Sequence, residues 1–253
     1  MSAHKIIFLN QKGGVGKTTT AVNIGSILAE YGNKVLLVDL DSQCNMTSSV
    51  SADSSLPGSY QLLEGLTPAR KLVQNTSVEN LYCIAGDLDL AGVSIELAQD
   101  ESRNLYLKKN LSVLENDYDY ILVDCPPELG VLSMNALAWT KYVFIPMQCE
   151  YFSLEGVNLL VRTISNVKRV LNPEIQILGI GFTMYSKRAK LHNEVVEDVS
   201  SFFNSLVFDT KIPRNIRLSE APSHGLPINV YDNSSVGGKA YRELTKEVMS
   251  RVR

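Results

Sequence analysis

The sequence has few cysteines, and they are not arranged to hold a metal or a disulfide framework. Four are spread over 253 residues, namely Cys44, Cys83, Cys125 and Cys149, with no Cys-x-x-Cys pair and no histidine at metal-ligand spacing. Disulfide-stapled domains, zinc sites and iron–sulfur sites depend on such spacings. We therefore expect four free structural thiols in a reducing compartment.

Long apolar runs are also missing. The run at residues 6–9 is too short for a signal peptide. No later run approaches the ~20 apolar residues that span a bilayer. These absences favour a cytoplasmic protein with no membrane partner.

No repeat, low-complexity tract or linker divides the chain, so we expect a single domain over residues 1–253. Short apolar runs alternate with stretches of helical period, which indicates an α/β fold with a doubly wound, mostly parallel sheet flanked by helices. A stretch rich in Ser and Asp, residues 42–58, favours a mobile loop near the active site. The predicted strands are 5–10, 34–39, 81–85, 120–124, 142–147 and 175–182, and the predicted helices are 17–31, 88–99, 103–115, 154–171, 191–204 and 236–251.

Charge is distributed unevenly along the chain. The net charge is −3, but residues 1–160 hold 10 Lys/Arg against 18 Asp/Glu, and residues 161–253 hold 14 against 9. The two parts therefore carry −8 and +5. A basic face can attract phosphates even though the whole molecule is acidic.

A glycine-rich loop follows the first predicted strand and precedes the first helix. Its glycines let backbone N–H groups surround phosphate oxygens, and the helix amino terminus adds partial positive charge. Lys17 is placed to reach the β- and γ-phosphates, and the Thr18 hydroxyl to ligate Mg²⁺. The predicted nucleotide-binding residues are Gly13, Gly14, Val15, Gly16, Lys17, Thr18 and Thr19.

Aspartates stand at the ends of two predicted strands. Asp39 and Asp41 alternate with Leu40, so both are expected on the side that faces the phosphates. One of them can orient the attacking water, and the other can support the metal or the loop that follows. Asp124 follows four apolar residues, an arrangement in which the carboxylate holds Mg²⁺. Capping of the following loop is the alternative role for Asp39 and Asp41.

The loop departs from the usual G-x-x-x-x-G-K-[ST] pattern, because Gln11 replaces the first glycine and a second lysine, Lys12, follows it. The string from Lys12 to Thr18 resembles the deviant Walker A box of the ParA/MinD ATPases, a type of P-loop NTPase. The resemblance implies that Lys12 crosses a dimer interface to the partner's nucleotide. It also implies that Asp41 positions the catalytic water, with Asp39 as its neighbour, and that Asp124 is the Walker B aspartate.

Two further segments, residues 147–156 and 212–225, resemble the ParA/Soj subgroup, so the likeness covers essentially the whole chain. It implies that Met184 and Pro213 lie beside the adenine ring, although apolar packing would also explain Met184. It also implies that Arg188 and Arg217 contact DNA. Further basic residues in the same neighbourhood are Lys187, Lys190, Arg214 and Lys211. Solvated surface arginines are the alternative.

This sequence also departs from the subgroup. Residues 186–190 read Ser-Lys-Arg-Ala-Lys where the subgroup commonly has an Asp-Ser-Arg-Thr-Asn-like run, and Ser42 and Cys44 stand where Pro and Gly are usual. The gain of lysines favours phosphate contact.

The resemblance implies a slow ATPase in which Mg²⁺ and ATP drive formation of a sandwich homodimer. That dimer would bind double-stranded DNA without sequence specificity, act at the nucleoid, and respond to a ParB-like partner. One alternative is a MinD-like membrane ATPase, which needs a free amphipathic carboxyl-terminal helix. The apolar stripe of residues 236–252 is more simply explained by docking on the sheet. A metabolic enzyme of the same superfamily is the other alternative, and it would need a substrate site or cluster cysteines.

Overall fold

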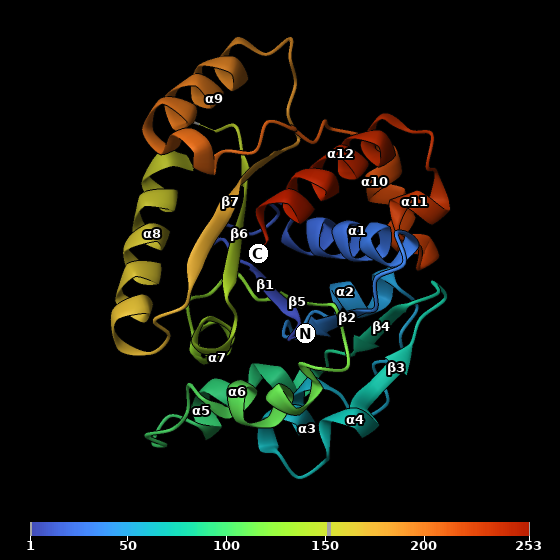
Figure 1. Cartoon of the computed structure of the whole chain (residues 1–253), viewed down its shortest axis with the longest axis vertical. Coiled ribbons are helices and arrows are strands. Elements are labelled where there is room, and N and C mark those ends of the chain that lie inside the picture. The colour runs from blue at the N-terminus through green and yellow to red at the C-terminus, as the bar shows by residue number, and fades with distance from the viewer. Residues whose placement is uncertain (1, 151–152, 253) are drawn as a thin grey trace.

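Seven strands form one sheet in the order β3-β4-β2-β5-β1-β6-β7, in which β3 alone is antiparallel to its neighbour (Figure 1). The computed structural model describes residues 2–150 and 153–252. The central strands are apolar because both of their faces are covered. The strands are β1 (His4–Phe8), β2 (Val35–Asp39), β3 (Val73–Asn75), β4 (Leu81–Ile84), β5 (Tyr120–Asp124), β6 (Tyr142–Gln148) and β7 (Gln176–Thr183).

One face of the sheet is covered by α1 (Lys17–Glu30) and α12 (Val236–Arg251), which lie side by side (Figure 1). Tyr241, Leu244 and Val248 of α12 are buried in this core, so its apolar stripe is docked, as predicted. No helix in residues 2–150 or 153–252 is long and apolar enough to cross a bilayer. The same side holds α2 (Asn45–Ser49), α10 (Ile216–Glu220), η4 (Ala221–His224) and α11 (Ile228–Tyr231).

The opposite face packs against a second apolar core. Its main helices are α7 (Val131–Trp139), α8 (Ser153–Val170) and α9 (Lys190–Phe203). Shorter elements complete this helix layer: α3 (Ser59–Glu64), α4 (Ala69–Leu72), η1 (Leu88–Ala91), α5 (Val93–Glu96), α6 (Tyr106–Leu111), η2 (Ser112–Leu114) and η3 (Asn204–Leu206).

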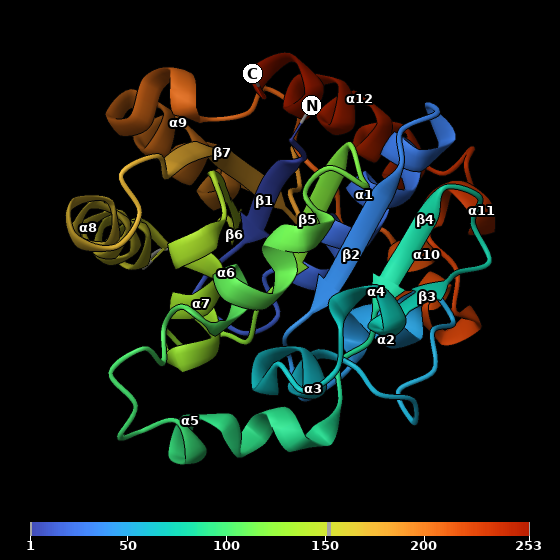
Figure 2. The same cartoon turned by 60° about the horizontal axis from the view of Figure 1, so that its bottom comes forward.

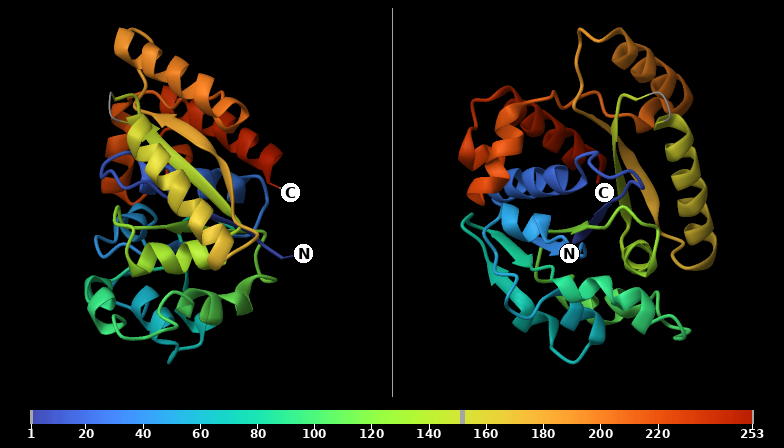
Figure 3. Two further views of the ribbon diagram at one scale, coloured as in Figure 1. Left: turned by 90° about the vertical axis from the view of Figure 1, so that its left-hand side faces the viewer. Right: turned by 180° about the vertical axis from the view of Figure 1, so that it is seen from behind.

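The start of β1 and the end of α12 lie on the same side of the molecule (Figure 3).

Three sequence predictions differ from the structure, and some elements were not predicted. The helix at 88–99 is two short pieces, η1 and α5, separated at Gly92, and the helix at 103–115 is α6 followed by η2. The loop at 42–58 contains α2, whose Met46 is buried in the core. The helix α7 and the short strand β3 were not predicted. The α7 sequence is apolar nearly all round and therefore has no helical period to detect.

The parallel strands place their carboxyl ends along one edge of the sheet. Asp39 at the end of β2 and Asp124 at the end of β5 are register partners, and Phe8 of β1 pairs with Asp124 on its other side. The loop after β1 therefore begins between the ends of β5 and β6. Open parallel sheets bind ligands at this edge.

Candidate nucleotide-binding site

The glycine-rich loop has a backbone that only glycine adopts readily. Gly14 and Gly16 have φ values of 72° and 85°. A methyl group added at Gly13 or Gly14 would meet no atom within 4 Å, so this part of the loop faces open space. The first turn of α1 has no acidic side chain. The loop therefore presents an open, N–H-rich surface suited to an anion.

Neighbouring strand ends hold the loop in place. The Thr183 hydroxyl donates to the Val15 carbonyl at 2.8 Å, and the Gln148 amide donates to the Gly14 carbonyl at 2.7 Å. At the start of the loop, Asn10 donates to the Pro146 carbonyl at 2.7 Å. These contacts come from β6 and β7, and they preorganise the loop for binding.

A cavity of about 620 Å³ opens in front of the loop. Lys17 is 7% exposed, and its ammonium donates to the Lys12 carbonyl at 3.4 Å. Burial lowers the pKa of Lys17, and the nearby carboxylates of Asp124 and Asp41 partly oppose this shift. The lining includes Gly13, Gly14, Gly16, Lys17, Thr18, Thr19, Asp41, Gln43, Asn45, Pro127 and Met184.

Asp124 lies behind Thr18, whose hydroxyl donates to Asp124 Oδ2 at 2.5 Å. Asp124 Oδ1 is buried and has no hydrogen-bond partner. Burial, and then the nearby Asp39 carboxylate, raise the pKa of Asp124 to about 8. A buried oxygen without a donor fits a cation or its water shell. No cluster of three His, Cys, Asp or Glu side chains occurs in the described part of the chain, but Mg²⁺ beside a phosphate needs only one or two protein ligands.

Asp39 faces the protein interior. It is fully buried and accepts hydrogen bonds from the Thr47 N–H at 2.9 Å, the Thr47 hydroxyl at 2.7 Å and the Asp41 N–H at 3.1 Å. Burial raises its pKa to about 6, although these hydrogen bonds oppose the shift. The Thr47 hydroxyl in turn accepts from the Gly86 N–H at 2.8 Å. Asp39 thus fastens α2 to the sheet, which corresponds to the capping alternative. No sequence signal pointed to Thr47 as its partner.

Asp41 is the carboxylate of this strand end that lines the cavity. It accepts a hydrogen bond from the Gln43 N–H at 3.0 Å. Its position opposite Lys17 suits the predicted water-positioning role, which stays a prediction.

Met184 and Pro213 meet in a second cavity of about 180 Å³. This cavity shares Gly16, Thr19 and Met184 with the larger one. A bridge between Tyr185 and Pro213 brings the two segments together. The base of a nucleotide could occupy this cavity while the phosphates of the same nucleotide contact the glycine-rich loop. The adenine contact itself stays a prediction.

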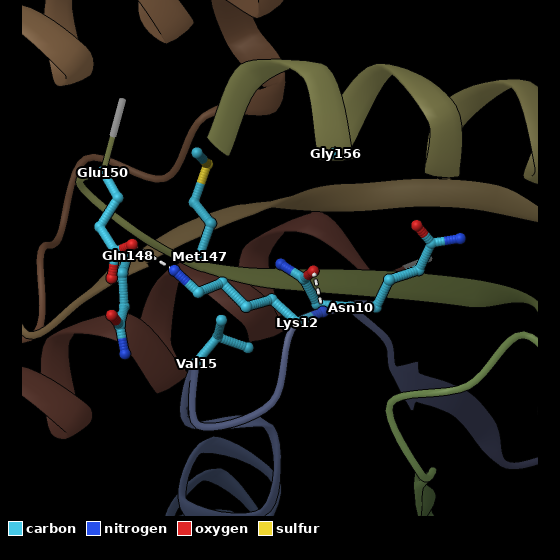
Figure 4. A pocket seen from close by; sticks show the side chains of 8 residues that line it. Asn10, Lys12, Val15, Met147, Gln148, Glu150 and Gly156 are labelled. Carbon is cyan, nitrogen blue, oxygen red and sulfur yellow. Dashed lines mark hydrogen bonds and ion pairs between the residues drawn. The ribbon is translucent and has the colours of Figure 1, made fainter. Parts of the chain in front are cut away.

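Lys12 does not line the phosphate cavity. Its side chain extends toward Glu150 (Figure 4). Lys12 lines a separate cavity of about 380 Å³ with Asn10, Val15 and Gln148. Its half-exposed ammonium forms an ion pair with Glu150. Glu150 was not among the predicted site residues, although it lies in the segment 147–156. Tyr151 and Phe152 of that segment lie outside the described residues.

The predicted DNA-contact residues fall in two segments that the Tyr185–Pro213 bridge brings together. Lys187, Arg188 and Arg214 are exposed. Lys190 is exposed and lies 3.5 Å from Glu194. The loop before α9 is held by hydrogen bonds to that helix: His192 accepts from the Ser186 N–H, and Asn193 donates to the Lys187 carbonyl.

Arg217 differs from these residues because acidic neighbours hold it. Its guanidinium lies 2.9 Å from Glu220 and 3.4 Å from Asp232. Hydrogen bonding to Glu220 raises the pKa of Arg217 further. The structure therefore distinguishes Arg217 from Arg188 and Arg214, which form no ion pair within residues 2–150 and 153–252.

The chain matches known proteins over nearly its whole length. Residues 3–177 match the family model described as an AAA domain. The chain is 49% identical over 246 residues to the chromosome-partitioning ATPase Soj of Treponema pallidum, covering 97% of each chain. It is 46% identical to the sporulation initiation inhibitor protein Soj of Bacillus subtilis, covering 96% of this chain and 97% of the relative.

Solved structures of related proteins have the same fold. Cobyrinic acid a,c-diamide synthase of Mycobacterium smegmatis, with an ATP analogue and magnesium, has a TM-score of 0.86 at 34% identity, covering 96% of this chain and 93% of that one. A plasmid partition protein of Borrelia burgdorferi with AMPPNP has a TM-score of 0.85 at 26% identity, covering 99% and 100%. With its glycine-rich loop, strand-end aspartates and full-length similarity to the Soj proteins, the chain belongs to the Soj/ParA family of partitioning ATPases.

Proposed function

We propose that the protein is an ATP-dependent DNA-partitioning switch. Binding of magnesium and ATP brings two subunits into a sandwich dimer, the dimer binds double-stranded DNA without sequence specificity, and hydrolysis releases it. A ParB-like partner stimulates that hydrolysis, and the protein acts at the nucleoid.

The observation that carries the proposal is the direction of Lys12. Lys17, from the same loop, is buried in the phosphate cavity, whereas Lys12 leaves that cavity and is half exposed. A lysine in this position serves its own nucleotide poorly and is accessible to a second subunit. Exchange of Lys12 between two subunits would make dimerisation depend on the triphosphate.

The residues around the cavity suit magnesium and ATP. The loop N–H groups and Lys17 would hold the phosphates, and Thr18 with Asp124 would hold the metal, which supplies charge neutralisation at the transferred phosphate. Phosphate oxygens would replace the Lys12 carbonyl as the acceptor for Lys17 at this site. Met184 and Pro213 would take the adenine.

Asp41 would orient the attacking water, since it is the carboxylate that lines the cavity opposite Lys17. Asp39 would act indirectly, because its hydrogen bonds to Thr47 fix the segment that carries Asp41 and α2. The segment after β2 would thus be tied to the sheet through Asp39, and its Asp41 would face the γ-phosphate.

DNA binding would use Arg188, Lys187, Lys190 and Arg214, with Arg217 as a weaker contributor. These side chains would contact DNA phosphates, and phosphate contact alone gives salt-dependent, non-specific binding. Two subunits present the surface twice, so a modest affinity per subunit becomes a useful one.

The proposal is tested by replacing Lys12 with alanine. Molar mass is measured by light scattering with saturating magnesium and a non-hydrolysable ATP analogue, and nucleotide affinity is measured separately. Lys12→Ala should bind nucleotide yet remain monomeric, while wild type dimerises. Lys71→Ala, another exposed lysine on α4, serves as the matched control and should dimerise normally. A monomeric wild type, or a dimeric Lys12→Ala variant, would refute the sandwich.

A further inference from the structure

A further cavity, apart from those around the glycine-rich loop, is lined by residues of α3, α5 and the start of α6. Figure 2 shows α3 and α5 on the same side of the molecule. The cavity has a volume of about 260 Å³ and an apolar floor made by Leu63, Val93 and Leu97. Leu66 at its rim is 82% exposed. We call this feature the α3–α5 groove.

More apolar surface lies beside the α3–α5 groove. Leu88 and Ile95, on the same segment as Val93, are 77% and 82% exposed. With Leu66, they are the three most exposed large apolar side chains among the described residues. Grouped exposure of this kind indicates an interaction surface, whereas single exposed apolar residues are ordinary.

The walls of the α3–α5 groove are acidic. Residues 58–66 and 87–101 contain six carboxylates and no lysine or arginine. Glu64 and Glu96 line the groove directly. Cationic residues follow these walls in the chain: the Arg103 guanidinium donates to the Ala98 carbonyl at 2.6 Å, and α6 carries Lys108 and Lys109. A ligand for this groove should therefore carry positive charge beside its apolar groups.

Hydrogen bonds between the walls hold the groove open. Asp87 accepts from the Tyr60 N–H at 3.0 Å and from the Leu90 N–H at 3.3 Å, which joins the start of α3 to η1. The Tyr60 hydroxyl donates to Glu96 at 3.0 Å. A groove whose walls are already fixed loses little conformational entropy when a partner docks.

We propose that the α3–α5 groove docks a cationic amphipathic segment of another protein. Apolar side chains of that segment would pack on Leu63, Leu66 and Leu97, and its lysines or arginines would face Glu64 and Glu96. This inference does not depend on the dimer or on DNA binding.

The experiment uses the full-length protein and three fluorescein-labelled peptides of fourteen residues. One has leucine and lysine in an amphipathic helical order, the second has glutamate in place of lysine, and the third is the leucine–lysine peptide in scrambled order. Fluorescence anisotropy should give at least about tenfold tighter binding for the first peptide than for either of the others. Raising the salt concentration should weaken that binding.

Two substitutions then locate the binding. Leu66→Ser and Glu64→Lys should each raise the Kd for the amphipathic leucine–lysine peptide by about tenfold. Both positions are exposed, so the variants should fold, and a thermal melt checks this. The matched controls are Val170→Ser on α8 and Glu197→Lys on α9, which make the same chemical changes at exposed sites elsewhere.

The outcomes are decisive in either direction. Equal binding of the lysine and glutamate peptides, or equal losses in the groove variants and their controls, would overturn the proposal. If sedimentation shows that Leu66→Ser abolishes self-association, the groove binds a second copy of this chain instead, and the proposal is wrong.

Discussion

The ammonium of Lys12 and the carboxylate of Glu150 form an ion pair within one chain. Glu150 follows β6, whereas Lys12 belongs to the loop after β1, so the pair connects two neighbouring strand ends. Lys12 must leave this carboxylate before it can reach another subunit. The pair therefore opposes the dimer that we propose.

Replacement of Glu150 with glutamine should make dimerisation easier. A half-exposed ion pair contributes about 0.2–1 kcal/mol, so the nucleotide concentration at half-dimerisation should fall by no more than about fivefold. Light scattering across a titration with a non-hydrolysable ATP analogue measures this shift. A higher midpoint in Glu150→Gln would indicate that Glu150 supports the dimer.

Asp124 should make the stability of the nucleotide-free protein depend on pH. Its pKa is raised to about 8, against an ordinary value near 4, so between these pH values the folded state keeps a proton that the unfolded state releases. The free energy of unfolding should therefore fall as the pH rises through this window. Asp39, whose pKa is raised to about 6, contributes in the same direction.

Asp124→Asn removes the larger of these two titrations. Between pH 5 and pH 8, without magnesium, its Tm should fall by at least about 3 °C less than that of wild type. Asp53→Asn, at a fully exposed carboxylate, is the control and should follow wild type. Parallel curves for Asp124→Asn and wild type would show that Asp124 is ionised throughout.

Asp41→Ala should bind ATP and stay in the dimer, because the variant keeps the phosphate loop but loses the group that orients water. Phosphate release in a single turnover should slow by about 100-fold or more, the usual contribution of a positioned acid–base group. Asp53→Ala again serves as the control. Unchanged phosphate release would remove Asp41 from the hydrolysis step.

Arg188→Ala should weaken DNA binding more than Arg217→Ala. Arg188 is exposed, whereas Arg217 must first leave Glu220 and Asp232. Gel shifts on random duplex DNA with ATP, at several salt concentrations, should also show a smaller salt slope for Arg188→Ala. Equal effects of the two variants would show that the pairing of Arg217 does not persist on DNA.

Thr47→Val should destabilise the protein by about 1–3 kcal/mol, because Asp39 and the Gly86 N–H both lose a buried partner. The change conserves volume, so packing should be little affected. Denaturant unfolding measures the loss, and Ser48→Ala in the same helix provides a control for a single exposed hydroxyl.

The strands and long helices could be predicted from the sequence because their patterns are local. β5 is a run of apolar residues ended by Asp124, and α12 repeats its apolar side chains at helical spacing, so both were predicted with the correct bounds. The segment 88–99 carries the same kind of pattern, yet it breaks at Gly92, where η1 ends and α5 begins. Short elements of this kind depend on tertiary contacts such as that between Asp87 and Tyr60.

The phosphate loop could be predicted from the sequence because the spacing of its glycines, lysine and threonine along the chain determines how the loop folds. The partners of its charged residues could not be read in this way. Glu150 lies 138 residues from Lys12, and Asp232 lies 15 residues from Arg217, directly after α11, so nothing local links either pair. The alternation of Asp39, Leu40 and Asp41 predicts that both carboxylates lie on the same side of the strand. In the structure Asp39 instead faces the interior, where it bonds to the buried Thr47.

The position of β1 in the middle of the sheet has a further consequence. On one side of its loop lie the strand-end aspartates of the acidic part of the chain, and on the other lie Met184 and Pro213, next to the basic segments. A nucleotide seated there would touch both parts at once, its triphosphate against one and its base against the other. Loss of the γ-phosphate at one end could then act on the proposed DNA-binding surface at the other end through the ligand itself, without a long path through the protein.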